Sequence, residues 1–301
     1  MSTPAHSESL QAPVLLVILN HRGTAKQAFE AIRDAKPRRL YVVADASSTG
    51  VPTSADQCEE GRNIVEQVDW SCDVKTLFRE TNVGSSAGRS HAFTWFFEQE
   101  EEGIILEDDC VPSRSFFWYC QELLDRYRSD HRVMHIGGNN FLEGWQKDRD
   151  YSYYFSRRGH VWGWATWRRA WRHFDFSIGL YPKLRDQAAF RSAFLHWPER
   201  FYWFRKFDET ATSDAWHFQW DFARYINSGL AIVPTENLVR NADALDTGTK
   251  RRPSGVRIAG LQAHDIDLPL RHPPFVIGDL ESDRREFRNL IRDIIFSKLD
   301  L

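Results

Sequence analysis

Short apolar runs alternate with amphipathic segments through roughly the first 110 residues of the chain. The runs Val14 to Leu19 and Leu40 to Ala44 are typical of strands buried on both faces of a parallel sheet. Between them, Thr24 to Ala35 repeats its apolar residues with the period of a helix. We expect further strands at Val74 to Phe78 and Gly103 to Leu106, and helices at Cys58 to Val68 and Arg89 to Glu98. This alternation predicts an α/β fold with a mostly parallel central sheet flanked by helices.

The second half of the chain is richer in tryptophan and less regular in its alternation. Helices are expected at Phe116 to Tyr127, Trp164 to His173 and Trp216 to Ile226, and strands at Val133 to Gly137 and Leu230 to Val233. The 12 tryptophans of the chain cluster in this half. They either line a sugar-binding surface or fill the core, and both interpretations remain open at this point.

Residues 1–12 are polar and are expected to form a disordered tail without a signal sequence, followed by a single domain over 13–280. Net charge is −3, which gives no reason to expect a nucleic-acid partner. The four cysteines match no zinc or redox spacing, so we expect free thiols in a reducing, cytoplasmic environment.

The C-terminal segment, 281–301, is expected to be an amphipathic helix. Its aliphatic residues are flanked by Arg284, Arg285, Arg288 and Arg292. Such a helix usually packs on its own domain, which is our first expectation. A peripheral contact with an anionic membrane surface is the alternative.

Three consecutive carboxylates, Glu107, Asp108 and Asp109, end the apolar run Gly103 to Leu106. Like charges this close repel one another, and burying them is costly unless a cation neutralises them. In open α/β sheets ligands bind at the carboxyl ends of strands. Hard oxygen ligands at that place suit Mg²⁺ or Mn²⁺ held together with substrate phosphates. The triplet therefore indicates a metal–diphosphate site, with a solvated acidic turn as the alternative.

Other polar groups follow the neighbouring strands and would meet the triplet at one edge of a parallel sheet. Arg22, after the first strand, could pair with a diphosphate. Asp45, after the second, could accept a hydrogen bond from a base N–H. The loop from Asn82 to Arg89 contains two glycines that allow close approach of the backbone to a ligand. Each group also fits an ordinary surface charge or turn, so it is their shared location that indicates a ligand site.

Two common nucleotide-binding motifs are absent from the sequence. There is no Gly-x-x-x-x-Gly-Lys-Ser/Thr, and Asn20-His21-Arg22-Gly23 stands where a dinucleotide-binding Gly-x-Gly-x-x-Gly would follow the first strand. This argues against a kinase-like NTPase and against a nicotinamide-dependent enzyme.

The order of these pieces resembles nucleotide-sugar glycosyltransferases of the GT-A fold, over about Val14 to Asp246. Glu107 to Asp109 resembles the Asp-x-Asp metal motif of that fold, in the Glu-Asp-Asp form of the N-acetylglucosaminyltransferase I family. Gly163 to Trp171 resembles a Trp-rich motif of related bacterial family-2-like transferases. Asp214 to Trp220, with Gly229 to Pro234 after it, resembles their acceptor-side helix and last strand.

The resemblance implies inverting, metal-dependent transfer of a hexosyl or N-acetylhexosaminyl group from a UDP-type donor to a glycan, lipid-linked or other hydroxyl acceptor. It divides the domain into a nucleotide-binding half, 13–112, and an acceptor half, 113–280. Carried over by position, it implies donor-side roles for Arg22, Asp45, Asn82, Arg89, Glu107 and Asp108. Asp45 would contact a uracil-like base, Asp108 the ribose or sugar, and Asp109 the metal ion.

The chain departs from the family at the general base, where many relatives carry Trp-Asp and this chain has Trp216-His217. Histidine can accept a proton near neutral pH. Asp214 is an equal candidate, although it would also serve as a helix N-cap. Asp221 lies four residues after His217 and could orient it or act as a third candidate. The third metal contact also stays open, because no histidine stands between residues 241 and 249.

Two rival functions share part of this pattern. A nucleotidyltransferase that makes sugar nucleotides would use the same strand-end site, but usually needs an N-terminal Gly-rich loop bearing Lys or Arg, which is absent. A non-catalytic carbohydrate-binding domain would use the tryptophans and leave the acidic triplet a structural role. Metal-dependent hydrolysis of a sugar nucleotide separates the transferase from that domain.

Overall fold

The computed structural model describes residues 9–18, 24–45, 62–79, 84–142, 145, 150–210, 215–242 and 260–298. The strands are β1 Val14–Ile18, β2 Arg39–Ala44, β3 Asp73–Phe78, β4 Glu102–Glu107, β5 Cys110–Pro112, β6 Val133–Gly137, β7 Tyr153–Ser156, β8 Trp164–Trp167, β9 Leu230–Pro234 and β10 Val239–Asn241. The helices are α1 Ala25–Ala35, α3 Ser85–Gln99, α4 Arg114–Tyr127, α5 Arg168–Trp171, α6 Tyr181–Leu184, α7 Ala188–Arg191, α8 Trp197–Glu209, α9 His217–Ile226 and α11 Leu280–Lys298.

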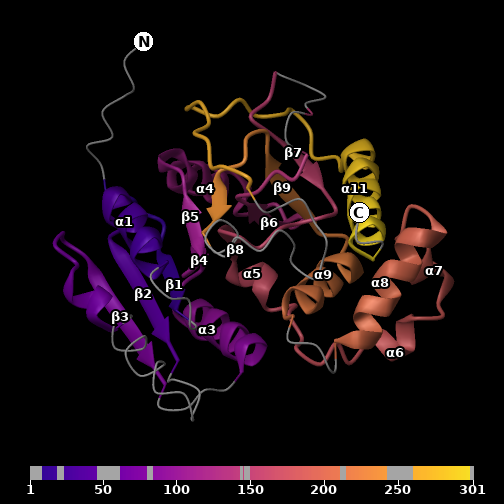
Figure 1. Cartoon of the computed structure of the whole chain (residues 1–301), viewed down its shortest axis with the longest axis horizontal. Coiled ribbons are helices and arrows are strands. Elements are labelled where there is room, and N and C mark those ends of the chain that lie inside the picture. The colour runs from indigo at the N-terminus through magenta and orange to yellow at the C-terminus, as the bar shows by residue number, and fades with distance from the viewer. Residues whose placement is uncertain are drawn as a thin grey trace.

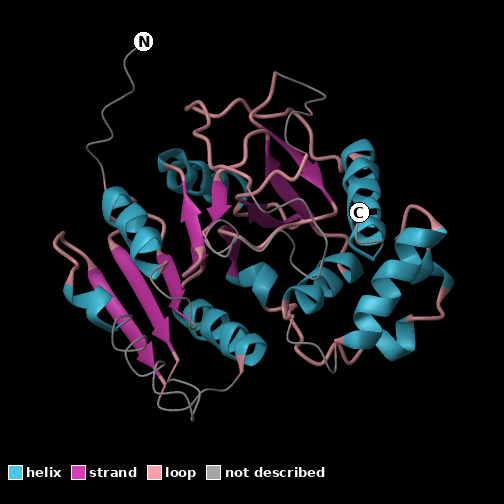
Figure 2. Cartoon of the chain, in the orientation of Figure 1, coloured by secondary structure: helices cyan, strands magenta, loops and turns pink. Residues whose placement is uncertain are grey.

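A central sheet runs through the whole molecule (Figures 1 and 2). Within the described ranges it has eight strands in the order β3-β2-β1-β4-β8-β6-β9-β7, and β5 pairs with β10 in a separate ribbon. β3, β2, β1 and β4 are parallel, whereas β8 runs antiparallel to both β4 and β6. β9 is parallel to β6, and β7 is antiparallel to β9. The predicted α/β fold class is confirmed, with the parallel order strongest in the N-terminal half.

Helices cover both faces of the sheet because its strands are apolar on both sides. Val14 and Leu16 belong to a core shared with α1 and α4, whereas Leu15 and Val17 belong to one shared with α3 and α9. This alternation within β1 is the period-two pattern of a strand between two layers. A third apolar cluster joins α6, α7 and α8 to the outer face of α9. The site elements are therefore held by three connected cores.

The helix predicted from Trp164 to His173 is only partly correct. The first four residues form β8, and only Arg168–Trp171 is helical. Gly163 before them has φ +60°, a left-handed conformation that suits glycine at the entrance to the strand. Trp164 packs on one side of the sheet and Trp167 on the other. Pairing with β4 and β6 therefore outweighed the helical spacing of these tryptophans.

The tail predicted over 1–12 is too long by several residues. Leu10 is fully buried, its N–H donates to the carbonyl of Ala35, and its carbonyl accepts from the N–H of Arg38. This short segment packs beside the end of α1 because burying a leucine favours the ordered state. Of the helix predicted over 58–68, residues 62–66 are helical and 58–61 lie outside the described residues.

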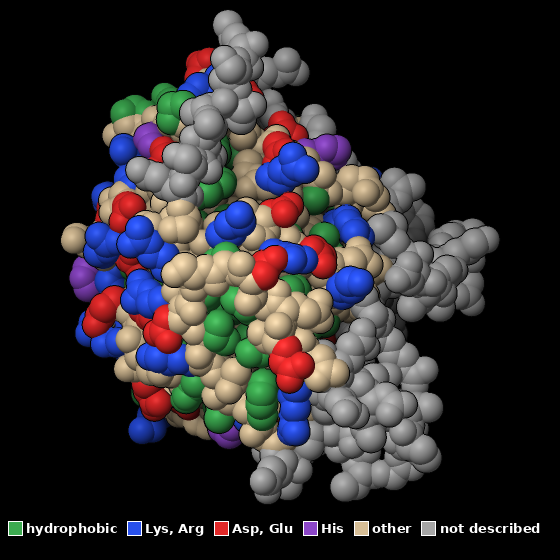
Figure 3. Space-filling model, turned by 90° about the vertical axis from the view of Figure 1, so that its left-hand side faces the viewer, with side chains coloured by type: hydrophobic (Ala, Val, Ile, Leu, Met, Phe, Trp, Pro, Cys, Tyr) green, Lys and Arg blue, Asp and Glu red, His purple; other side chains and the backbone are tan. Residues whose placement is uncertain are grey.

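β3 forms the exposed edge of the sheet in the N-terminal half, where charged residues discourage pairing with another chain. Figure 3 shows the molecule from this side, with acidic and basic side chains interspersed over the visible face. Among the described helices, none combines the length and the low charge that crossing a bilayer requires.

Candidate functional site

Two aspartates flank the carboxyl end of β1, where three parallel strands end together. The N–H of Asp45, after β2, donates to the carbonyl of Ile18 at 3.4 Å. The N–H of Asp108, after β4, donates to the carbonyl of Val17 at 3.0 Å. Both side chains are buried, with relative exposures of 2% and 0%. Sheet register alone therefore brings the two predicted donor-side aspartates to the same edge.

Arg89, on α3, connects this edge to the carboxylate cluster, by which we mean Glu107, Asp108 and Asp109. Its Nε donates to Oε2 of Glu107 at 2.6 Å. Burial alone would lower the pKa of Arg89, but the charges of all three carboxylates raise it above its ordinary value. The structure thus brings Arg89 and the predicted acidic triplet together, and a buried cation offsets part of their repulsion.

Asp109 lies at the start of the β5–β10 ribbon. Two residues much later in the chain hold it in position. Oδ2 of Asp109 accepts from Nδ2 of Asn241 at 2.6 Å, and its carbonyl accepts from the N–H of Ala242 at 2.8 Å. Asn241 was not given a role by the sequence, because a contact across 132 residues leaves no local pattern. Asp109, the partner of Asn241, remains the predicted metal ligand.

The donor set at this edge fits a divalent ion held jointly with a substrate. The described part of the chain contains no group of three His, Cys, Asp or Glu side chains arranged to hold a metal ion. Mg²⁺ does not require one, because it usually takes one or two carboxylates and completes its shell with water and phosphate oxygens. Asp108 and Asp109 supply hard carboxylate oxygens of that kind beside each other. Asp109 is the one of the two that would hold Mn²⁺ or Mg²⁺ here, with Asp108 left to the ribose or sugar of the donor.

Asp45 is already engaged by a cation that the sequence analysis did not assign. Nη1 of Arg79 lies 2.5 Å from its Oδ1, and Nη2 of Arg79 donates to the carbonyl of Gly88 at 3.1 Å. Arg79 therefore ties the end of β3 to Asp45 and to the start of α3. The predicted residues Arg22, Asn82 and Asp214 lie outside the described residues.

His217 begins α9 and lines a groove in the second half of the chain. Burial lowers its pKa below the usual value, with Asp221 opposing this and the charges of Lys206, His160 and Arg89 adding to it. A neutral imidazole at physiological pH has a nitrogen lone pair that can accept a proton.

Asp221, the residue predicted to orient His217, is held by a different partner. Oδ1 of Asp221 lies 2.5 Å from Nη2 of Arg224, which is almost fully buried. This ion pair commits an oxygen of Asp221 to Arg224 rather than to the ring of His217.

A groove of about 1580 Å³ opens beside His217. It is lined by residues of α8, α9 and α11, including His217 and Asp221. Of the two interpretations of the tryptophans, core packing holds for Trp164, Trp167, Trp171, Trp216 and Trp220, which are buried. Trp145, Trp197 and Trp203 do line the groove.

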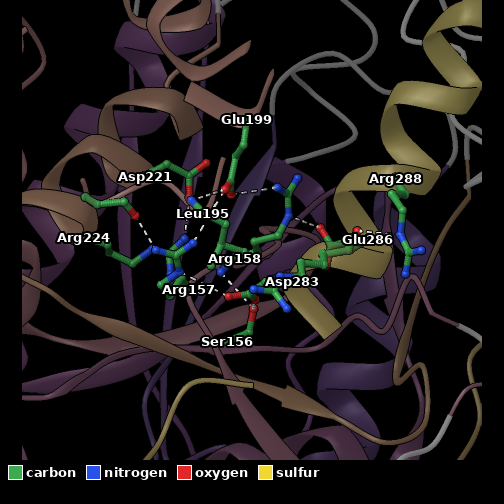
Figure 4. A network of polar contacts seen from close by, with 12 residues as sticks. Ser156, Arg157, Arg158, Leu195, Glu199, Asp221, Arg224, Asp283, Glu286 and Arg288 are labelled. Atoms are coloured by element: carbon green, nitrogen blue, oxygen red, sulfur yellow. Dashed lines mark hydrogen bonds and ion pairs between the residues drawn. The ribbon is translucent and has the colours of Figure 1, made fainter. Parts of the chain in front are cut away.

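A buried network of charges forms the floor between α8 and α11 (Figure 4). Nε of Arg158 donates to Glu286 on α11 at 2.7 Å, and its Nη1 lies 3.9 Å from Glu199 on α8. Arg157 lies between Glu199 and Asp283, at 3.7 Å and 3.3 Å. Two consecutive arginines after β7 thus hold both helices that wall the groove.

This network determines how the C-terminal helix packs. Burial alone would raise the pKa of Glu286, but the nearby charges of His160 and Arg158 lower it to about 2. The helix expected over 281–301 is observed as Leu280–Lys298 and packs on the domain, as first expected. Its buried face contains Ser282, Asp283, Glu286 and Phe287, however, rather than the aliphatic residues singled out in the sequence.

No protein-family model matches the chain, and no curated protein matches its sequence. Solved structures match its fold. A mannosyltransferase from Pyrobaculum calidifontis, in complex with GDP-Man and Mn²⁺, is 15% identical over 79% of this chain, with a TM-score of 0.40. The chain spans only 59% of the length of that protein.

Two further matches show the same general architecture. The glycosyltransferase GlyE of Streptococcus pneumoniae is 11% identical, covers 96% of this chain and 64% of its own, and has a TM-score of 0.33. The 4-diphosphocytidyl-2C-methyl-D-erythritol synthase of Anaerococcus prevotii is 11% identical over 65% of this chain and 83% of its own, also with a TM-score of 0.33.

Proposed function

We propose that the chain is an inverting glycosyltransferase that moves a hexosyl or N-acetylhexosaminyl group from a nucleoside diphosphate donor, UDP in our first choice, to an acceptor hydroxyl. The observation that carries the proposal is the convergence of two features. A carboxylate cluster paired with Arg89 lies at the carboxyl edge of parallel strands, and His217, whose pKa is lowered by burial, lines a large groove in the second half of the chain. A donor at the edge and an acceptor in the groove would meet between Arg89 and His217.

The donor side follows from the charges at the strand ends. Asp45 would contact the base, Asp108 the ribose or sugar, and Asp109 a Mn²⁺ or Mg²⁺ ion, with Arg22 and Asn82 also on this side. The metal, when bound, supplies positive charge to the leaving diphosphate. Arg89 contributes a second cation that stays protonated at any physiological pH.

The acceptor side supplies the base. His217 takes the proton of the acceptor hydroxyl on a ring nitrogen while the oxygen forms a bond to the anomeric carbon. The bond from that carbon to the diphosphate oxygen breaks, and its electron pair leaves with the diphosphate. Attack from the face opposite the leaving group inverts the anomeric centre. Asp214 remains the alternative base, whereas Asp221 is disfavoured by its pairing with Arg224.

Product analysis tests the reaction class. The protein is incubated with UDP-glucose, UDP-N-acetylglucosamine or GDP-mannose, each with Mn²⁺, and the released nucleotide is identified. A transferase releases the nucleoside diphosphate, slowly to water and faster when an acceptor is present. Formation of nucleoside triphosphate from the sugar nucleotide and pyrophosphate identifies a nucleotidyltransferase. Binding of glycans without any turnover identifies a carbohydrate-binding domain, and either of these results overturns the proposal.

A further inference from the structure

The aliphatic residues of α11 face the groove instead of the core. Leu290, Ile291 and Ile294 line the groove, and Ile295 beyond them is 51% exposed. The helix is anchored by the acidic residues that pair with Arg157 and Arg158. With these acidic residues and Phe287 on its buried face, α11 presents the aliphatic residues as an apolar wall of the groove.

The opposite wall, on α8, carries large aromatic side chains at the mouth of the groove. Trp197 and Phe201 are 71% and 66% exposed and stand one helical turn apart. Tyr202 and Trp203 line the groove further in. Exposed Trp and Phe on one helix edge are typical of groups that enter the boundary between water and acyl chains.

Two arginines on the α11 wall have no acidic partner in the described structure. Arg288 and Arg292 line the groove one turn apart, and neither makes an ion pair with a described residue. By contrast Lys206, also at the groove, is paired with Glu209. Like charges at this spacing repel one another, so an anionic ligand at this place would relieve the repulsion.

We propose that the groove between α8 and α11 binds an anionic lipid as the acceptor. Its acyl or prenyl chain lies between the aromatic wall and the aliphatic wall, its phosphate meets Arg288 and Arg292, and its hydroxyl-bearing end reaches His217. This inference rests on the proposed function, since it names the acceptor class of that reaction. A soluble acidic saccharide fits less well, because Leu290, Ile291 and Ile294 offer nothing to its hydroxyl groups.

The groove is also large enough for such a ligand. Sites for small molecules usually have volumes of about 300–1,000 Å³. The volume here is about 1580 Å³, and exposed apolar residues stand at its mouth on both walls. A chain leaving through that mouth would pass Trp197 and Phe201 on its way into a membrane.

The test uses a short-chain lipid that dissolves as single molecules. Dihexanoyl phosphatidic acid, below its micelle concentration, is titrated into the full chain by calorimetry, with inorganic phosphate and dihexanoyl phosphatidylcholine as separate arms. We expect saturable binding of the phosphatidic acid, at least about tenfold tighter than either other ligand, because only it uses both the arginines and the apolar walls.

Matched variants locate the binding. R288Q/R292Q and F201S should each weaken phosphatidic acid binding at least about fivefold, whereas K26Q/R172Q should leave it unchanged. The control removes two exposed cations that do not line the groove. Thermal unfolding of each variant confirms that it is folded. Equal binding of phosphate and phosphatidic acid, or equal binding by R288Q/R292Q and the control, overturns the proposal.

Sugar-nucleotide binding, measured on the same variants, separates this inference from the proposed function. If the protein binds the sugar nucleotide but does not bind the lipid, or binds it outside the groove, only the proposed acceptor class is wrong. Lipid binding that is intact while no sugar nucleotide binds or turns over overturns the reaction and leaves a lipid site.

Discussion

At the scale of single residues, the site depends on which partner each charged side chain is paired with. Glu107 pairs with Arg89, and Asp109, held by Asn241, is the carboxylate proposed to bind the metal ion. His217 stays neutral because burial and the surrounding cations disfavour its protonated form. The proposed site thus combines a charged arginine, Arg89, with a neutral imidazole, His217.

The substitution H217Q tests the base. We expect sugar-nucleotide affinity to stay within about threefold of wild type and the rate of transfer to fall 10²- to 10⁴-fold, on the order of 3–5 kcal/mol of barrier. Because the pKa of His217 is lowered, the acid limb of the wild-type kcat/KM profile should lie below the usual histidine pKa of about 6.5. Both are measured by steady-state kinetics over a pH series. Near wild-type transfer by H217Q would move the role to Asp214.

Asp45 forms an ion pair with Arg79 in addition to its proposed contact with the nucleotide base. We expect D45N to lower the free energy of unfolding by about 3 kcal/mol, because Arg79 would remain buried without its acid. We also expect UDP to raise the melting temperature of the wild type more than GDP does, and D45N to lose this difference. R79Q is the matched control, since it breaks the same ion pair but keeps the carboxylate. A wild-type protein that favours GDP would remove the uracil contact.

At the scale of elements, α11 is held mainly by charge. Glu286 and Asp283 on α11 meet Arg158 and Arg157 from the segment after β7, and Glu199 joins both arginines to α8. Breaking one member of such a buried set leaves an unpaired charge, so the set behaves as a unit.

E286Q should therefore destabilise the protein in a pH-dependent way. The folded-state pKa of about 2 lies below the unfolded value of about 4.3, so the carboxylate stabilises the fold above about pH 4, and this contribution disappears as the pH falls toward 2. We expect E286Q to lose about 3 kcal/mol at pH 7, measured by urea unfolding, and the gap to wild type to close in acid. A gap that is the same at pH 7 and pH 3 would contradict this interpretation.

Substitutions at two tryptophans test how much a core position and a groove position contribute to stability. Trp164 on β8 is fully buried and contacts the rings of Phe93, Trp171 and Trp216, whereas Trp197 on α8 is 71% exposed. We expect W164A to lower the free energy of unfolding by about 3–5 kcal/mol and W197A to change it by less than about 0.5 kcal/mol. Chemical denaturation of both variants checks this. Similar losses at the two positions would contradict the placement of β8.

The sequence predicted the elements whose apolar pattern is local. The predicted bounds agree with the observed bounds within two residues at each end for β1, α1, β2 and β4. Each of these elements has a continuous apolar run or a clear helical face. β8 was missed because tryptophans at helical spacing also satisfy a strand between two layers. The ties from Arg79 to Asp45 and from Asn241 to Asp109 could not be predicted, since each joins residues far apart in the chain.

At the scale of the whole molecule, the two halves of the chain contribute different parts of the proposed site. The parallel strands of the first half bring Asp45 and the carboxylate cluster to one edge. Helix α9 of the second half brings His217 to a groove that α8 and α11 also line. In Figure 1 the two halves lie side by side along one continuous sheet, so the sheet itself sets the distance between them.

Nucleotide binding that requires both the metal and Asp109 tests the central claim most directly. The melting temperature is measured for the wild type and D109N with UDP, GDP and their sugar conjugates, with and without Mn²⁺. At 100 times the dissociation constant a ligand adds about 2.7 kcal/mol, which raises the melting temperature of a protein this size by several degrees. We expect this rise for the wild type only with Mn²⁺ present, and none for a folded D109N. A protein that no nucleotide stabilises, or a D109N variant stabilised as much as the wild type, would contradict the account.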